Sequence, residues 1–122
     1  MSIRALDHIQ LAMPKGGEAA ARAFYDGLLG IPEVPKPENL RARGGCWFEA
    51  GALKVHLGVD PEFTPAQKAH PAFIVDGLSA LVSRLSNAGY SVVADQPLAG
   101  YERRYVSDPF GNRIELMEPI PG

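Results

Sequence analysis

Four side chains that can bind a metal ion stand at matching places in the two halves of this 122-residue chain. His8 and His70 lie near the starts of the halves, 62 residues apart, and His56 and Glu115 lie near their ends, 59 residues apart. Such offsets fit one unit that occurs twice. Imidazole and carboxylate donors together suit Zn, Ni, Fe, Co or Mn. The chemistry that this pattern indicates is therefore that of one divalent metal site, provided that the fold brings the four side chains together.

The neighbours of these residues indicate that all four point to the same face of a sheet. Successive side chains of a strand alternate between its two faces. Apolar residues stand directly beside each candidate, as Ile114 and Leu116 do beside Glu115. We expect the apolar set to pack against helices and the four polar side chains to converge on a concave face. Glu115 is the most informative, because a carboxylate inside an apolar run is costly unless it is paired.

The elements that must position these residues occur in the same order in both halves. The first half predicts a strand over 7–13, a helix from about Glu18 that stops at Gly30, at most an edge strand in the proline-rich segment 32–37, and a hairpin of 44–49 and 53–59. The second half predicts a strand over 69–75, a helix with an apolar stripe from Leu78 to Leu85 that ends at Gly89, a short strand over 90–94, and a hairpin of 101–107 and 113–117.

This order predicts the α+β class, with two paired βαβββ modules that form a cupped mixed sheet with the helices outside. Module one covers about residues 1–60 and module two about 68–118, within a single domain over 1–122. Each module alone has little apolar area to bury at this size. We therefore expect the two sheets to pack together or join.

Three segments resemble the vicinal oxygen chelate superfamily, which includes glyoxalase I, fosfomycin-modifying thiol transferases, extradiol dioxygenases and bleomycin-resistance proteins. They are Leu6–Ala12, Ala23–Gly30 and, above all, Ser107–Glu115 with its Asp108-Pro109-Phe110-Gly111-Asn112 turn. The resemblance covers nearly the whole chain. It implies paired βαβββ modules, frequent homodimers, and one divalent metal ion held by the first strands of both modules and the last strands of one or both.

Within that resemblance, His8, His70 and Glu115 match the ligand positions. The remaining ligand position, on the last strand of the first module, is a glutamate in glyoxalase I and corresponds to His56 here. The sites form either within one chain or between the two chains of a dimer.

Other residues are expected to line a cavity for an organic substrate. Gln10 shares the face of His8, and Trp47 and Tyr105 occupy corresponding hairpin strands of the two halves. Arg103 has the parity of Tyr105, whereas Arg104 points away. A guanidinium beside a metal favours an anionic group such as a carboxylate, enolate or phosphonate, so the expected ligand is a small anionic molecule.

Two functions remain open. One is a metal-dependent lyase, isomerase, dioxygenase or thiol transferase, in which the metal holds two adjacent substrate oxygens and Glu115 or a metal-bound water acts as base. The other is a metal-free binding or sequestering protein of the bleomycin-resistance type. The coexistence of His8, His70 and Glu115 favours the enzyme.

Composition limits the partners and the compartment. A net charge of −2 without a basic run predicts no nucleic-acid partner. No apolar run approaches the about 20 residues that span a bilayer, and the first residues lack the apolar core of a signal peptide. The single Cys46 suits a reducing compartment. We therefore expect a cytoplasmic protein without a membrane partner.

Overall fold

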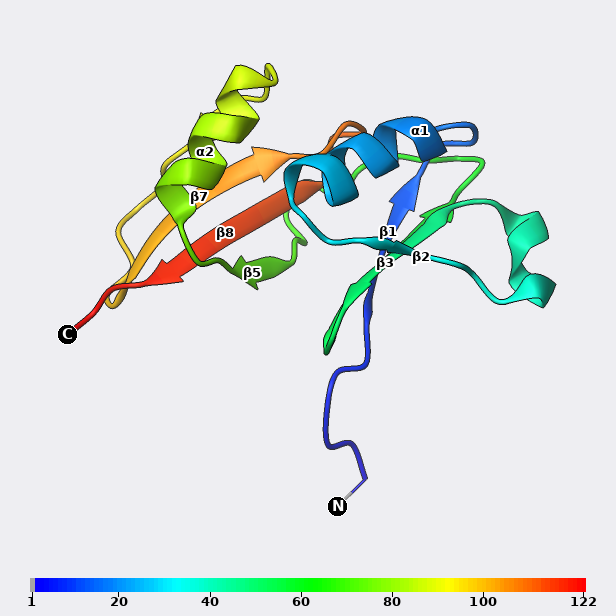
Figure 1. Cartoon of the computed structure of the whole chain (residues 1–122), viewed down its shortest axis with the longest axis horizontal. Coiled ribbons are helices and arrows are strands. Elements are labelled where there is room, and N and C mark those ends of the chain that lie inside the picture. The colour runs from blue at the N-terminus through cyan, green and yellow to red at the C-terminus, as the bar shows by residue number, and fades with distance from the viewer. Residues whose placement is uncertain (1) are drawn as a thin grey trace. The chain divides into compact units, whose positions relative to one another are not determined.

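The computed structural model describes residues 2–122, which fall into two compact units: module one, which ends at Thr64, and module two, Pro65–Gly122. Module one contains β1 (Ile9–Met13), α1 (Glu18–Ala21), η1 (Arg22–Leu28), β2 (Glu33–Val34), η2 (Glu38–Arg43), β3 (Cys46–Ala50) and β4 (Leu53–Val59). Module two contains β5 (Ala72–Ile74), α2 (Leu78–Asn87), β6 (Val92–Val93), β7 (Tyr101–Ser107) and β8 (Arg113–Pro119). These elements are labelled in Figure 1 where space allows.

Both modules contain a four-stranded mixed sheet with the same topology. The strand order is β1-β4-β3-β2 in module one and β5-β8-β7-β6 in module two. In each sheet the last strand lies between the first and the third, parallel to the first and antiparallel to the third. The predicted α+β class and the paired βαβββ order are confirmed.

The helix of module one buries one face against its own sheet. Helices α1 and η1 form one continuous helical stretch from residue 18 to 28, as predicted, and its last turn is wide because the Leu29 N–H donates to the Phe24 carbonyl. Phe24 and Tyr25 are fully buried, and the Tyr25 ring stacks on Phe48 of β3 at 5.4 Å between centroids. These contacts fix one face of β3 and β4 as the core face, which leaves the other face for polar residues.

Module two repeats this arrangement with α2 over its sheet (Figure 1). The predicted apolar stripe is confirmed, since Leu78, Leu81 and Leu85 are buried and α2 contacts β6 and β8. The β7–β8 turn is fixed by Asp108, whose carboxylate accepts the N–H groups of Phe110 and Asn112.

Among the described residues, no helix has the length and apolar character needed to cross a bilayer.

Several strand bounds differ from the sequence prediction by one or two residues, as for β6 (92–93 instead of 90–94), and three further differences bear on the site. Strand β1 begins at Ile9 rather than at residue 7, and β5 begins at Ala72 rather than at residue 69. Pro71, which has no N–H to donate, directly precedes β5. His8 and His70 therefore stand just before the first strands and not within them. The third difference is the 3₁₀ helix η2, for which no element was predicted.

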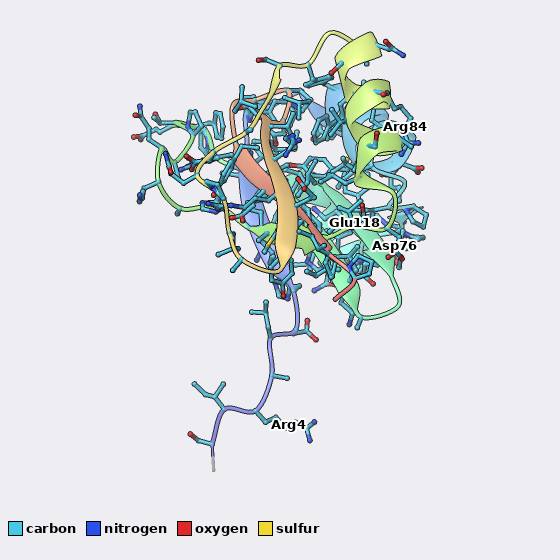
Figure 2. All side chains as sticks on the ribbon, turned by 90° about the vertical axis from the view of Figure 1, so that its left-hand side faces the viewer. Arg4, Asp76, Arg84 and Glu118 are labelled. Atoms are coloured by element: carbon cyan, nitrogen blue, oxygen red, sulfur yellow. The ribbon has the colours of Figure 1, made fainter. Side chains whose placement is uncertain are left out.

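Helix α2 is capped by a side chain from a distant strand. Its N-cap residue, Gly77, has no side chain to do so. Instead, the Glu118 carboxylate accepts the Gly77 N–H at 2.7 Å and the Leu78 N–H at 3.1 Å, and Figure 2 shows Glu118 beside the start of this helix. These two backbone hydrogen bonds hold the pKa of Glu118 below its ordinary value. The end of β8 and the start of α2 are thereby joined.

Replacing Glu118 with glutamine should lower the free energy of unfolding at pH 7, because the amide is a weaker acceptor at a helix N-terminus. A carboxylate with a lowered pKa stabilises the fold fully above its ordinary value of 4.5 and loses that effect as the pH falls through the lowered pKa. Urea unfolding of E118Q and wild type should therefore converge in acid. E62Q, at an exposed site of module one, is the control; an E118Q protein as stable as E62Q at pH 7 would contradict the capping role.

Candidate functional site

Glu115 is the centre of a polar cluster in module two. It pairs in register with Tyr105 of β7, on the strand next to its own, and only 7% of its surface is exposed. Its Oε1 lies 2.9 Å from Nε2 of His70 and accepts the Tyr105 hydroxyl at 3.1 Å. Its Oε2 accepts from Nη1 of Arg103 at 3.3 Å. The burial of this carboxylate is thus compensated by three polar neighbours.

Two arginines hold the Tyr105 ring and hydroxyl. Arg103 Nη1 donates to the Tyr105 hydroxyl at 2.9 Å, and its Nη2 donates to the Gln96 carbonyl at 2.7 Å. The Arg113 guanidinium lies over the Tyr105 ring, 4.2 Å from its centroid, within the range of a cation–π interaction. Arg104 instead pairs with Glu102. Arg103 therefore shares the face of Tyr105 and Glu115, as its parity predicts.

The charges of this cluster shift two proton equilibria. Burial by itself raises the pKa of Glu115, but the hydrogen bonds from His70, Tyr105 and Arg103 outweigh it, and the pKa lies below its ordinary value. Burial, followed by the hydrogen bond to Glu115, raises the pKa of Tyr105. At neutral pH the cluster therefore holds an ionised carboxylate beside a protonated phenol.

Module one gathers three rings at the corresponding place. His56 pairs in register with Gln10 on one side and with Trp47 on the other. Its imidazole is stacked on the Trp47 indole, with centroids 3.9 Å apart and planes 2° apart, and on the His8 ring at 4.4 Å. Its Nε2 lies 2.8 Å from Oε2 of Glu49. The module thus brings together every residue that the sequence predicted for its part of the site.

The environment of His70 tests whether these residues suit a divalent metal ion. Its Nδ1 faces the Lys68 carbonyl at 3.0 Å, and its Nε2 faces Oε1 of Glu115. Because both partners are acceptors, both contacts are hydrogen bonds only when the ring carries two protons. A neutral ring that keeps its Nδ1 proton presents the Nε2 lone pair to the same space as a carboxylate oxygen. An Nδ1–H bonded to a carbonyl is also what orients histidine ligands in metal sites.

The distance between His70 and Glu115 is that of a hydrogen bond, 2.9 Å. Two donors on a tetrahedral zinc ion, each about 2.0–2.2 Å from it, would lie roughly 3.4 Å apart, so the two side chains would separate slightly to hold such an ion between them. His8 is also suited to bind a metal ion, because Asp7 contacts its Nδ1 at 2.9 Å and no residue of 2–122 hydrogen-bonds its Nε2. His56 could bind a metal ion only through Nδ1, since Glu49 contacts its Nε2. Within the described residues, no three His, Cys, Asp or Glu side chains form one metal-binding group.

Sequence reasoning missed two members of these clusters. Arg113 is two residues from Glu115 on β8, so strand parity alone could have placed it on the same face. Glu49 has the parity of Trp47 on β3 and could have been found in the same way. A hollow of about 840 Å³ in module two touches Tyr105 and Arg113. Neither His70 nor Glu115 lines it, so this hollow is separate from the donor pair.

Comparison with known proteins identifies the family. The glyoxalase-like domain family matches residues 11–117. The crystal structure of a glyoxalase family protein from Bacillus anthracis is 48% identical, covers 98% of both chains and has a TM-score of 0.93. No curated protein matches the chain. The chain belongs to the glyoxalase-like domain family, within the vicinal oxygen chelate superfamily.

More distant structures share the fold. A genomically encoded fosfomycin resistance protein from Listeria monocytogenes is 16% identical, with 97% of this chain and 95% of that chain covered and a TM-score of 0.77. An antibiotic binding protein from a Streptomyces species is 20% identical, with 98% and 99% covered and a TM-score of 0.73. At these identities the likeness concerns the fold alone.

Replacing Glu115 with glutamine should destabilise the protein by about 1–3 kcal/mol at pH 7, because the amide is a poorer partner for the part-buried Arg103 guanidinium and the Tyr105 hydroxyl. The stability that Glu115 contributes is complete above its ordinary pKa of 4.5 and is lost as the pH falls through its lowered pKa. Denaturant unfolding between pH 3 and 7 should therefore show the difference from wild type shrinking in acid. The control is E102Q, and a loss for E115Q that does not depend on pH would contradict this account.

Proposed function

We propose that the chain is a metal-dependent, glyoxalase-like enzyme that acts on a small molecule with two adjacent oxygen atoms. In this proposal the ligands of one divalent ion, chosen among Zn, Ni, Fe, Co and Mn, are His8, His56, His70 and Glu115. The observation that supports it best is the contact of His70 Nε2 with Glu115 Oε1 at 2.9 Å, between two groups that a neutral ring leaves with facing lone pairs.

Glu115 is the group that we assign as catalytic. A bound divalent ion supplies Lewis acidity toward the two adjacent oxygens of a substrate. Glu115 is ionised at neutral pH because its pKa is lowered, so it can accept a proton without first losing one. Its Oε1 already contacts two groups and its Oε2 only one, which makes Oε2 the oxygen with more free acceptor capacity.

Four further residues are proposed to contact the substrate: Gln10, Trp47, Arg103 and Tyr105. Arg103 carries a charge that favours an anionic ligand, and its contacts with Tyr105 and Glu115 hold the guanidinium on the same face as both. Its Nε is buried and has no hydrogen-bond partner among the described residues. A small anionic, oxygen-rich substrate would pair with the positive charge of this guanidinium.

The alternative is a metal-free protein that binds or sequesters a small molecule. It is favoured by the hydrogen bonds that already surround the proposed ligands. His70, Tyr105 and Arg103 satisfy Glu115, and Glu49 satisfies Nε2 of His56. The same two faces would then serve as walls of a binding site. Metal stoichiometry separates the two functions directly.

Metal-free protein titrated with Zn, Ni, Fe, Co and Mn should bind at least one of these ions at one ion per chain, measured by calorimetry and elemental analysis. H70A should weaken that binding by about a hundredfold, because a ligand contributes at least as much as the outer partners that orient it. A saturating metal at 100 times its Kd should also stabilise the wild type by about 2.7 kcal/mol.

E102Q is the matched control, since Glu102 lies on the same hairpin and is exposed. Wild-type affinity in H70A, or no stoichiometric binding of any of the five ions, would refute the metal site and favour the binding protein. Substrate screening with the bound metal then follows, with product formation as the readout.

We also propose a homodimer. Each sheet ends on short edge strands, and on β5 and β6 the apolar side chains of Ile74 and Val93 are 64% and 52% exposed. Natural sheets usually cover or protect such edges. Sedimentation equilibrium at micromolar concentration should give twice the mass of one chain, and a monomer there would refute the dimer.

A further inference from the structure

Module one contains a small hollow whose walls include residues without a role so far. Its volume is about 270 Å³, near the lower end of small-molecule sites. The sheet contributes Gln10, Trp47 and Gly58 to it, and the segment over 36–43 contributes Lys36, Leu40 and Arg43. The second group includes residues of η2, the helix that the sequence did not predict. The hollow therefore lies between this segment and residues of β1, β3 and β4.

A glycine shapes the floor of the hollow. A Cβ at Gly58 would lie 2.5 Å from Nε2 of Gln10. Since such a distance is far inside van der Waals contact, any side chain at position 58 would displace the Gln10 amide. Gly58 has no positive φ, so its backbone would accept alanine without strain. The missing side chain thus leaves space for the Gln10 amide, and an alanine at this position tests that space together with the placement of the amide.

The walls carry two positive charges and none of the residues that line the hollow is acidic. Lys36 Nζ donates to the Gly44 carbonyl, which holds the ammonium at the rim. The Arg43 guanidinium makes no hydrogen bond to any residue of 2–122 and is exposed. The Glu18 carboxylate, whose Oε2 accepts the Gly45 N–H at 2.8 Å, interacts with Lys36 and offsets part of its charge, which leaves Arg43 as the main attraction for an anion. The hollow therefore attracts an anion, and the guanidinium of Arg43 offers it N–H donors that bind no other residue of 2–122.

The remaining lining is apolar. Leu40, Leu57 and Val59 contribute aliphatic surface beside the Trp47 indole, which lies flat against the His56 ring. We propose that this hollow binds the acidic end of a small, flat monoanion, a carboxylate or phosphonate held by Lys36 and Arg43 with its apolar body against Trp47. This inference rests on the proposed function, because it assigns the hollow to the substrate of the site proposed there.

Trp47 is the only tryptophan of the chain, so its fluorescence reports on this hollow directly. Metal-free protein, kept in chelator, is titrated with benzoate and with benzamide, its uncharged counterpart. Benzoate should change the emission saturably and bind at least tenfold more tightly than benzamide. R43A and K36A should each weaken benzoate binding roughly tenfold, as expected for a charge-assisted hydrogen bond, and G58A should weaken it similarly by filling the floor.

K15A, which removes an exposed cation of the same module, is the control and should bind benzoate like the wild type. R43A is the decisive variant, because K36A also removes a hydrogen bond within the segment. Equal binding of benzoate and benzamide, or wild-type benzoate affinity in R43A, would overturn the inference.

The metal titration, repeated on R43A, separates this inference from the proposed function. Normal metal binding with wild-type benzoate affinity would overturn the inference and leave the metal site standing. Absence of metal binding together with benzoate binding that depends on Arg43 would support the inference and refute the metal-dependent enzyme.

Discussion

The buried carboxylate of Glu115 is the constraint on which module two depends. It lies between Ile114 and Leu116 on β8, an interior strand whose neighbouring side chains are fully buried. An ionised group at such a place is tolerated only with good partners. The fold supplies three of them from two places: His70 from the segment before β5, and Tyr105 and Arg103 from β7. The pairing of β5, β7 and β8 therefore also sets the positions of the polar groups around Glu115.

Module one keeps the same backbone plan with different chemistry. His56 occupies the register position that Glu115 has in module two, each paired with an aromatic residue of the preceding strand, Trp47 or Tyr105. In module two a central carboxylate is surrounded by donors, whereas in module one a central imidazole is paired with the carboxylate of Glu49. The two modules thus share the geometry and differ in the central group, a carboxylate in module two and an imidazole in module one.

Structural features that depend on residues close together in the sequence could be predicted, whereas features that depend on the packing of distant segments could not. The two hairpins, the helix stripe from Leu78 to Leu85 and the parity of Arg103 follow from alternation and periodicity. The stacking of His8, His56 and Trp47 requires the register of three strands, which no local pattern gives. Helix η2 was missed because its six residues have no apolar periodicity and follow Pro37. The hollow of module one, which is lined by residues of η2, could therefore not be predicted from the sequence either.

The insertion of each module's last strand between its first and third has a consequence for synthesis on the ribosome. Strand β4 joins β1 and β3, and β8 joins β5 and β7, so each sheet lacks its centre until its final strand has emerged. Until then the strands already made have no partner on that side, and such open edges invite association with other chains. Closing the sheet brings Ile9 to Val55 and Phe73 to Leu116, and contacts between such distant residues form slowly. Each half of the protein is thus most vulnerable to aggregation just before it is complete.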